Sequence, residues 1–205
     1  MQIALDHFRT SIARVRHLPL IYGHVAANPP PGPIPGLDLT DILRAQVVLA
    51  VSALDYYVHE VTRLGLIEIF EGKRPVTSHY LKYQVSLESV HNALAAPGTI
   101  GWVDTEIRTK HGFVAFQQAD KIADAIRLFS PVKLWNNVGA RIGIVPEDIR
   151  TRIDLIVHRR NKIAHEADLD PSYPNARWPI RLADATYATD FIERICENIH
   201  PVVIC

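Results

Sequence analysis

Apolar residues recur every three or four positions along most of the chain, which is the spacing of one helix face. The longest such stretch covers residues 37–70 and contains no proline, and Asp38 or Thr40 supplies an N-cap at its start. Additional apolar residues, among them Val51 and Tyr57, widen its stripe. We therefore predict a central helix that is buried on much of its surface.

Other segments carry the same spacing in shorter form. The N-terminal segment is amphipathic, with Phe8 and Ile12 on one face and Arg9 on another. The pattern predicts further helices at 78–94, 102–110, 117–129, 146–165 and 181–199. The segment 130–143 is typical of a loop. No alternating strand pattern competes, so we expect an all-α antiparallel helical bundle of four main helices with short additional helices.

Two proline-bearing stretches separate these helices. Residues 26–36 hold five prolines and two glycines, which exclude regular structure and favour an extended, partly stiff connector. The second stretch, 168–180, precedes the last predicted helix. The chain thus divides into an N-terminal helix at 1–25, the connector at 26–36 and a helical domain at 37–205. The connector is expected to cross between bundle helices; a hinge to a detachable N-terminal arm is the alternative.

Composition limits the partners of the protein. With 22 basic and 22 acidic residues the net charge is zero, so binding to a polyanion must come from a local patch. Cys196 and Cys205 form neither a disulfide framework nor a paired metal site. No apolar run is long enough to span a bilayer, and the charged N-terminus lacks the apolar core of a signal peptide. We expect a cytoplasmic protein without a membrane partner.

The segment RRNKIAH, Arg159 to His165, carries the candidate chemistry. RNA supplies its own nucleophile, the 2′-hydroxyl, so cleavage needs a proton carrier and a cation for the phosphate. His165 suits proton transfer near neutral pH, and the planar fork of Arg160 can hold two phosphate oxygens. Asn161 can orient the phosphate or fix the tautomer of His165. Arg159 and Lys162 add positive charge and are candidate RNA contacts.

The same segment matches a family motif in which a short spacer separates an arginine from a histidine and a polar residue follows the arginine. Together with segments 42–60, 102–112 and 119–128, in the same order, RRNKIAHEAD resembles the RiboL-PSP branch of the HEPN proteins. The resemblance runs from about Asp38 to about Ile199 and leaves the N-terminal helix outside. It implies a helical bundle that forms a homodimer with the motifs facing a shared cleft, and RNA cleavage without a metal or other cofactor.

The resemblance also implies a biological role. Such proteins act as toxins of toxin–antitoxin pairs or as defence effectors, so an antitoxin or a defence-system partner protein is expected. The alternative function is a non-catalytic module that binds RNA or a protein through the same cleft. The presence of His165 favours the enzyme, because phosphate binding alone needs no titratable group.

The spacing of the motif sets a geometric condition. Residues five apart on a regular helix, such as Arg160 and His165, point in clearly different directions, whereas Asn161 and His165 share a face. Arg160 and His165 can therefore meet on one phosphate only if the helix loosens there or the site is completed across a dimer.

The motif spacing alone is weak evidence, because Arg74 and His79 have the same separation. That copy contains Pro75 and lies at a predicted helix break, so we interpret it as a chance match to the spacing and not as a functional site. A structural reading of the later copy is a solvated helix end at which Arg160 and Lys162 complement the helix dipole.

Asp55 lies among apolar residues of the central helix, where a carboxylate is costly unless it has a partner. Members of the resembling branch carry an acidic residue in this region, so we expect Asp55 to orient Arg160 or His165. A structural salt bridge is the alternative. Asp55 and His59 without further ligands do not make a metal site, and none is expected. Trp102 is expected in the core.

Overall fold

The computed structural model describes residues 1–29, 31–32, 34, 37–173 and 176–204. Within them, no β-strand is present and Leu169 and Arg177 form an isolated antiparallel bridge. None of the described helices is long and apolar enough to cross a membrane. The predicted all-α fold is confirmed. Its elements are α1 (Gln2–Val15), α2 (His17–Ala27), α3 (Thr40–Phe70), η1 (Tyr80–Lys82, a 3₁₀ turn), α4 (Leu87–Ala95), α5 (Gly101–His111), α6 (Ala119–Arg127), α7 (Leu134–Ile142), α8 (Pro146–His165) and α9 (Leu182–Val203).

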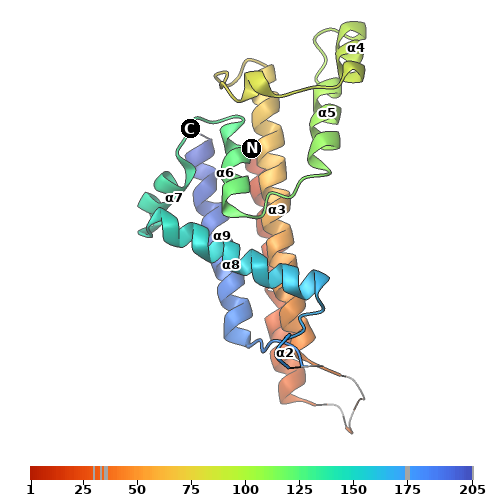
Figure 1. Cartoon of the computed structure of the whole chain (residues 1–205), viewed down its shortest axis with the longest axis vertical. Helices are drawn as coiled ribbons and strands as arrows, with labels where there is room; N and C mark the ends of the chain where they lie inside the picture. Colours follow the sequence, from red (N-terminus) through yellow and green to blue (C-terminus); the bar gives the residue numbers. More distant parts are fainter. Residues whose placement is uncertain (30, 33, 35–36, 174–175, 205) are drawn as a thin grey trace.

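Helix α3 is the axis of the bundle, and the other long helices pack against it (Figure 1). Helix α1 runs antiparallel to α3 (Figure 1). Helix α9 runs in the same direction as α3, since Gln46 bonds to Thr189 at 3.0 Å and, further along both helices, the hydroxyl of Tyr57 lies 3.5 Å from a ring nitrogen of His200. Helix α8 crosses α3 obliquely, which places the end of α8 beside the beginning of α3 (Figure 1).

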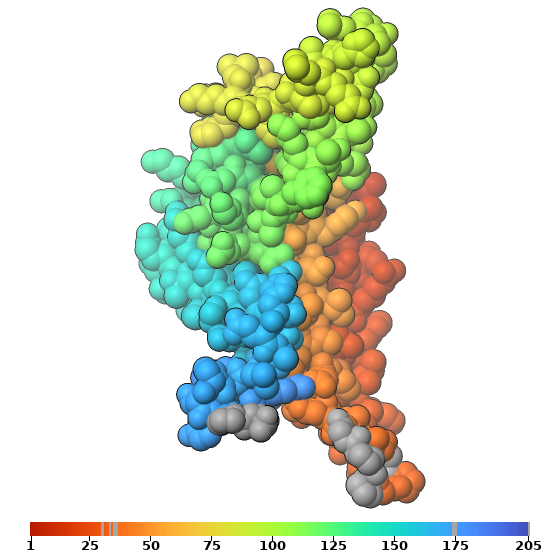
Figure 2. Space-filling model, turned by 45° about the vertical axis from the view of Figure 1, so that its right-hand side comes forward, coloured from red at the N-terminus to blue at the C-terminus, as the bar shows by residue number. Residues whose placement is uncertain are grey.

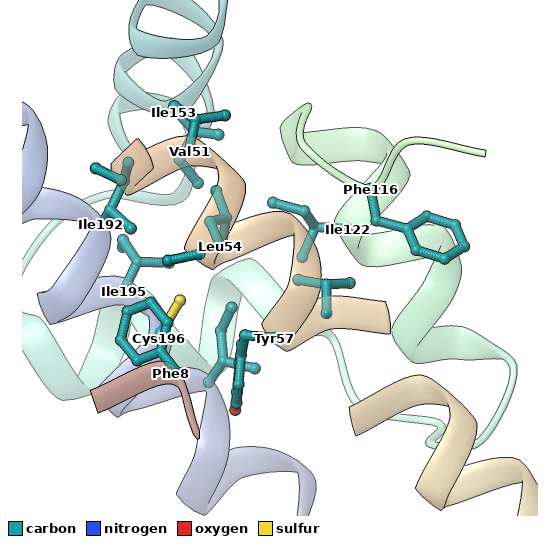
Figure 3. Close-up of a cluster of buried hydrophobic side chains, with 14 of the residues drawn as sticks. Phe8, Val51, Leu54, Tyr57, Phe116, Ile122, Ile153, Ile192, Ile195 and Cys196 are labelled. Carbon is teal, nitrogen blue, oxygen red and sulfur yellow. The ribbon is translucent and has the colours of Figure 1, made fainter. Parts of the chain in front are cut away.

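The core lies where α1, α3 and α9 meet (Figure 3). Phe8 of α1 and Tyr57 of α3 are fully buried there, with ring centroids 5.5 Å apart. Cys196 of α9 is buried in the same cluster, and Cys205 lies outside the described residues. Burying such side chains contributes about 1.5 to 3 kcal/mol each. The N-terminal helix is thus an integral part of the core, and the structure shows no detached arm formed by α1.

Helix α7 corrects the prediction of a loop at 130–143. Proline, asparagines and glycines in this stretch favour turns, but Leu134, Trp135 and Val138 are buried and hold one face of a short helix against the core. Gly143 ends the helix with a φ of 68°, a conformation in which a side chain is unfavourable. Gly139 is required by packing, because a Cβ there would lie 2.5 Å from the carbonyl oxygen of Ile144.

Other boundaries also differ from the sequence prediction. The helix predicted at 78–94 begins only at α4, where the hydroxyl of Ser86 accepts a hydrogen bond from the N–H of Ser89 as an N-cap. The N-terminal helix is divided at Arg16 into α1 and α2. Because α2 continues to Ala27, the first residues of the expected connector at 26–36 are helical; residues 30, 33 and 35–36 lie outside the described residues.

Helices α4 and α5 project from one end of the bundle (Figures 1 and 2). Trp102, expected in the core, is only half-buried at the base of this projection and packs edge-on against Phe70, with centroids 5.4 Å apart. The tryptophan in the core is Trp135, whose indole N–H donates to the carbonyl of Ala119 at 3.0 Å. Trp135 of α7 therefore fills the main core, although the sequence predicts a loop at this position.

Candidate active site

The RRNKIAH motif occupies the last two turns of α8. Pro146 begins this helix in the position where a missing N–H costs nothing, and acidic residues follow it near the positive end of the helix dipole. His165 is the last helical residue. Beyond it, the N–H groups of Glu166 and Asp168 both donate to the carbonyl of Lys162 at 3.0 Å, which closes the helix end. The predicted helix and the position of the motif at its end therefore agree with the structure.

The helix stays regular through the motif. Arg160 is half-buried, whereas His165 is exposed. Because residues five apart on a regular helix differ by about 140° in direction, the two side chains do not face one phosphate within a single chain. Of the two ways to satisfy the spacing, local loosening of the helix is not seen in the described part of α8.

Arg160 has one defined contact inside the motif. Its Nη1 donates to the side-chain oxygen of Asn161 at 3.0 Å. Its Nε is buried and has no hydrogen-bond partner among the described residues. The contact occupies Nη1, while Nη2 makes no hydrogen bond within the described part of the chain and is not among the buried atoms without a partner. Arg160 therefore retains a donor that a phosphate oxygen can use.

A buried carboxylate lies directly after the motif. Asp168 is fully buried, and its Oδ2 accepts hydrogen bonds from Nε of Arg44 at 2.7 Å and from Nη2 of Arg159 at 2.9 Å. Both arginines also donate to the carbonyl of Trp178, at 2.9 and 3.2 Å. Burial lowers the pKa of Arg159, and the charge of Asp168 opposes this shift. The network joins the end of α8 to the beginning of α3 and to the loop before α9.

The network changes the interpretation of the two predicted RNA contacts. The guanidinium of Arg159 is engaged by Asp168 and by backbone carbonyls, which is a structural role. Lys162 lies 3.3 Å from the carboxylate of Glu166, one helical turn later, and remains partly exposed. Arg44 and Asp168 do not emerge from sequence reasoning, because they are separated by 124 positions and belong to no shared motif. The sequence feature that points to such a buried pair is the position of Arg44 beside the apolar stripe of the central helix, because a buried charge there needs a partner.

Asp55 has other partners than those predicted for it. Its Oδ1 accepts the backbone N–H of Phe116 at 2.7 Å, and its Oδ2 accepts a hydrogen bond from Nε2 of Gln117 at 3.1 Å. Nε2 of His59 lies 3.6 Å from the same carboxylate. Among the described residues, no hydrogen bond or ion pair joins Asp55 to the motif. The carboxylate fixes the segment before α6 to α3, so the expected orienting contact is replaced by a structural one.

This geometry predicts that Asp55→Asn lowers stability more than activity. An amide can accept only one of the two hydrogen bonds, so the free energy of unfolding should fall by about 1 kcal/mol or slightly more. Urea unfolding measures the loss, and RNA cleavage by the folded variant should remain normal. Unchanged unfolding together with lost cleavage would restore the orienting role.

The second copy of the motif spacing lies elsewhere in the molecule. Arg74 donates to the carboxylate of Glu68 at 3.1 Å and to the carbonyl of Val203 at 2.9 Å, and its guanidinium lies 5.4 Å from the ring centroid of Phe129. These contacts join the ends of α3 and α9.

Across the described residues no group of three or more side chains is arranged to hold a metal ion.

The family model RiboL-PSP-HEPN matches residues 25–203. Neither the curated proteins nor the solved structures yield a match. The matched range begins in α2 and includes α3 to α9, so it contains the RRNKIAH motif and the Asp168 network, while α1 lies before it.

Proposed function

The chain belongs to the RiboL-PSP-HEPN family, and from this membership we propose that it is a metal-independent endoribonuclease with Arg160, Asn161 and His165 as its catalytic residues. The observation that carries the proposal is the end of α8: an exposed histidine lies five residues from an arginine with an unused donor. A simple phosphate-binding site would need the arginine but not the histidine.

The proposed reaction uses the 2′-hydroxyl of the RNA as the nucleophile. His165 transfers a proton, either from the attacking hydroxyl or to the leaving 5′ oxygen. Arg160 stabilises the negative charge that develops on the phosphorus oxygens. Asn161 holds the guanidinium of Arg160 through its side-chain oxygen, which reduces the number of conformations that the arginine can adopt. Lys162 contributes positive charge at the edge of the site.

The proposed active form is a homodimer in which Arg160 of one chain faces His165 of the other. The regular helix keeps these two side chains apart within one chain, so a phosphate needs groups from two copies. Two large apolar side chains near the motif support such an interface: Leu155 of α8 is 62% exposed and Tyr187 of α9 is 48% exposed, and both line one groove. Exposed apolar groups that share a groove favour burial by a partner.

We expect the protein to sediment as a dimer at micromolar concentration. Mixing inactive His165→Ala chains with inactive Arg160→Ala chains should restore cleavage, because one of the two sites in the mixed dimer then has both intact residues. A monomer that cleaves RNA at full rate would contradict the shared site.

The proposed chemistry is tested by incubating the protein with RNA in excess EDTA and mapping the ends. Cleavage should persist and leave 2′,3′-cyclic phosphate and 5′-hydroxyl ends, since the proton carrier and the cation both come from the protein. Activity that requires added magnesium, or products with 5′-phosphate ends, would exclude this mechanism.

We also propose that the protein acts as a toxin or defence effector and is controlled by a partner protein. Helix α4 exposes an apolar stripe on the projecting part of the molecule, in which Leu87 is 88% and Leu94 75% exposed. The same stripe favours the second candidate function, a non-catalytic module that binds a protein or RNA. RNA that is bound but stays intact in the end-mapping experiment would favour that module over the enzyme.

A further inference from the structure

A large cavity lies far from the motif. It has a volume of about 690 Å³ and lies between α6, α7, Arg150 of α8 and the segment that contains Arg74 and His79. This volume lies within the range of pockets that bind small organic ligands. Arg150, on the wall of the cavity, precedes Arg160 by ten residues on the same helix, which corresponds to about 15 Å. The cavity and the proposed active site are therefore separate.

The lining of the cavity is cationic. Besides Arg74 and His79, it contains Arg127, Lys133 and Arg150, and no aspartate or glutamate among the described residues lines it. Each of the three arginines has a carboxylate partner that lies outside the lining. Arg127 pairs with Asp124, Arg150 with Asp120 and Arg74 with Glu68. Arg127 and Arg150 each use one nitrogen for that pairing and keep further donors.

Lys133 also lines the cavity, and its positive charge has no partner among the described residues. Its side chain is exposed and has no ion pair or hydrogen bond within the described part of the protein. It directly precedes α7, whose first turn also lines the cavity and has no side-chain cap. The unpaired N–H groups of that turn add to the positive potential. An anionic group placed beside Lys133 would meet both.

The rest of the wall has an apolar part beside polar residues such as Ser78 and Ser130. Pro75, Val76, Pro131 and Val132 form the apolar part, and Val76 is 56% exposed. A free phosphate ion would leave this part of the cavity unfilled, whereas a ligand with both a phosphate and a flat, weakly polar ring system matches the two halves of the lining.

We propose that this cavity binds a nucleoside phosphate, with the phosphate near Lys133 and the beginning of α7 and the base against the wall formed by Val76 and Pro131. The site is independent of the proposed ribonuclease activity. Two sources can supply the same chemistry: a free mononucleotide, or the terminal nucleotide of a nucleic acid strand.

The binding of AMP to the whole protein, measured by calorimetry at low salt, tests the proposal. Lys133→Ala should weaken AMP affinity by about fivefold or more, because it removes an unpaired charge from the site. Lys121→Ala is the matched control, since Lys121 is also an exposed lysine without an ion pair but lies outside the cavity lining. Neither lysine is part of the core, so both variants should unfold at the same urea concentration as the parent.

A second arm distinguishes the two sources. A deoxytetranucleotide with a 5′-phosphate, which offers no 2′-hydroxyl for cleavage, is compared with the same strand bearing a 5′-hydroxyl. Lys133-dependent binding of AMP supports a free nucleotide, and Lys133-dependent preference for the phosphorylated strand without AMP binding supports a strand end. The proposal is overturned if neither probe shows affinity that depends on Lys133, or if AMP affinity falls in Arg160→Ala and not in Lys133→Ala, which would place the ligand at the motif.

Discussion

Replacing His165 with alanine is expected to lower RNA cleavage by about a hundredfold or more, the usual contribution of a general acid or base. RNA affinity should change little, because a proton carrier acts mainly in the transition state. Single-turnover cleavage and RNA binding at the same pH give the two values. His158→Ala is a matched control, since His158 is also an exposed histidine on α8 but lies outside the motif.

Arg160→Ala should differ from His165→Ala in one respect. A guanidinium contacts phosphate before and during the reaction, so both affinity and cleavage should fall. Arg160→Lys keeps the charge but loses the planar fork and the geometry of the Asn161 contact, and should recover only part of the activity. Full cleavage by His165→Ala would remove the proposed mechanism and leave the family assignment intact.

The largest loss of stability is expected for Asp168→Asn. The substitution keeps the shape of the side chain but leaves the charge of Arg44, whose side chain is only 7% exposed, without its buried partner. Breaking such a pair costs about 3 kcal/mol or more. Urea or thermal unfolding should show this loss. Asp120→Asn is the control: Asp120 pairs with Arg150 but is 78% exposed, so its loss should cost less than about 1 kcal/mol.

Asp168→Asn is also expected to affect RNA cleavage. Because Asp168 closes the network at the end of α8, its loss should also let the motif fray, and cleavage should fall even at temperatures where the variant is folded. Stability equal to that of the parent would mean that the two arginines find sufficient partners in the carbonyls around them.

The sequence predicts the parts of the fold that depend on long, regular patterns. Helices α3, α8 and α9 follow from apolar spacing and from proline at the start of α8, and these signals agree with the structure. Helix α7 is missed because local residue preferences there favour a loop, while the burial of Trp135 decides the outcome. Periodicity over nine residues is too short to overcome such preferences.

The candidate site shows the same division. The motif is found from neighbouring residues, because an arginine, an asparagine and a histidine at helical spacing carry their chemistry locally. The partners of Asp55 and Arg159 depend on how distant segments pack, and sequence reasoning assigns both residues incomplete roles. Phe116 reaches Asp55 only when the loop before α6 folds back, and Asp168 reaches Arg159 only when the chain reverses after α8.

The parallel pairing of α3 with α9 has a consequence for the order of folding. Gln46 and Thr189 are 143 positions apart, and so are Tyr57 and His200, so these contacts of α3 can form only after α9 has been synthesised. A chain still on the ribosome therefore exposes one apolar side of α3 after α8 has already emerged. Such long-range closure slows folding and exposes the nascent chain to aggregation. Since the bundle is incomplete without α9, the motif lacks its fixed setting until α9 has been synthesised and has packed against α3.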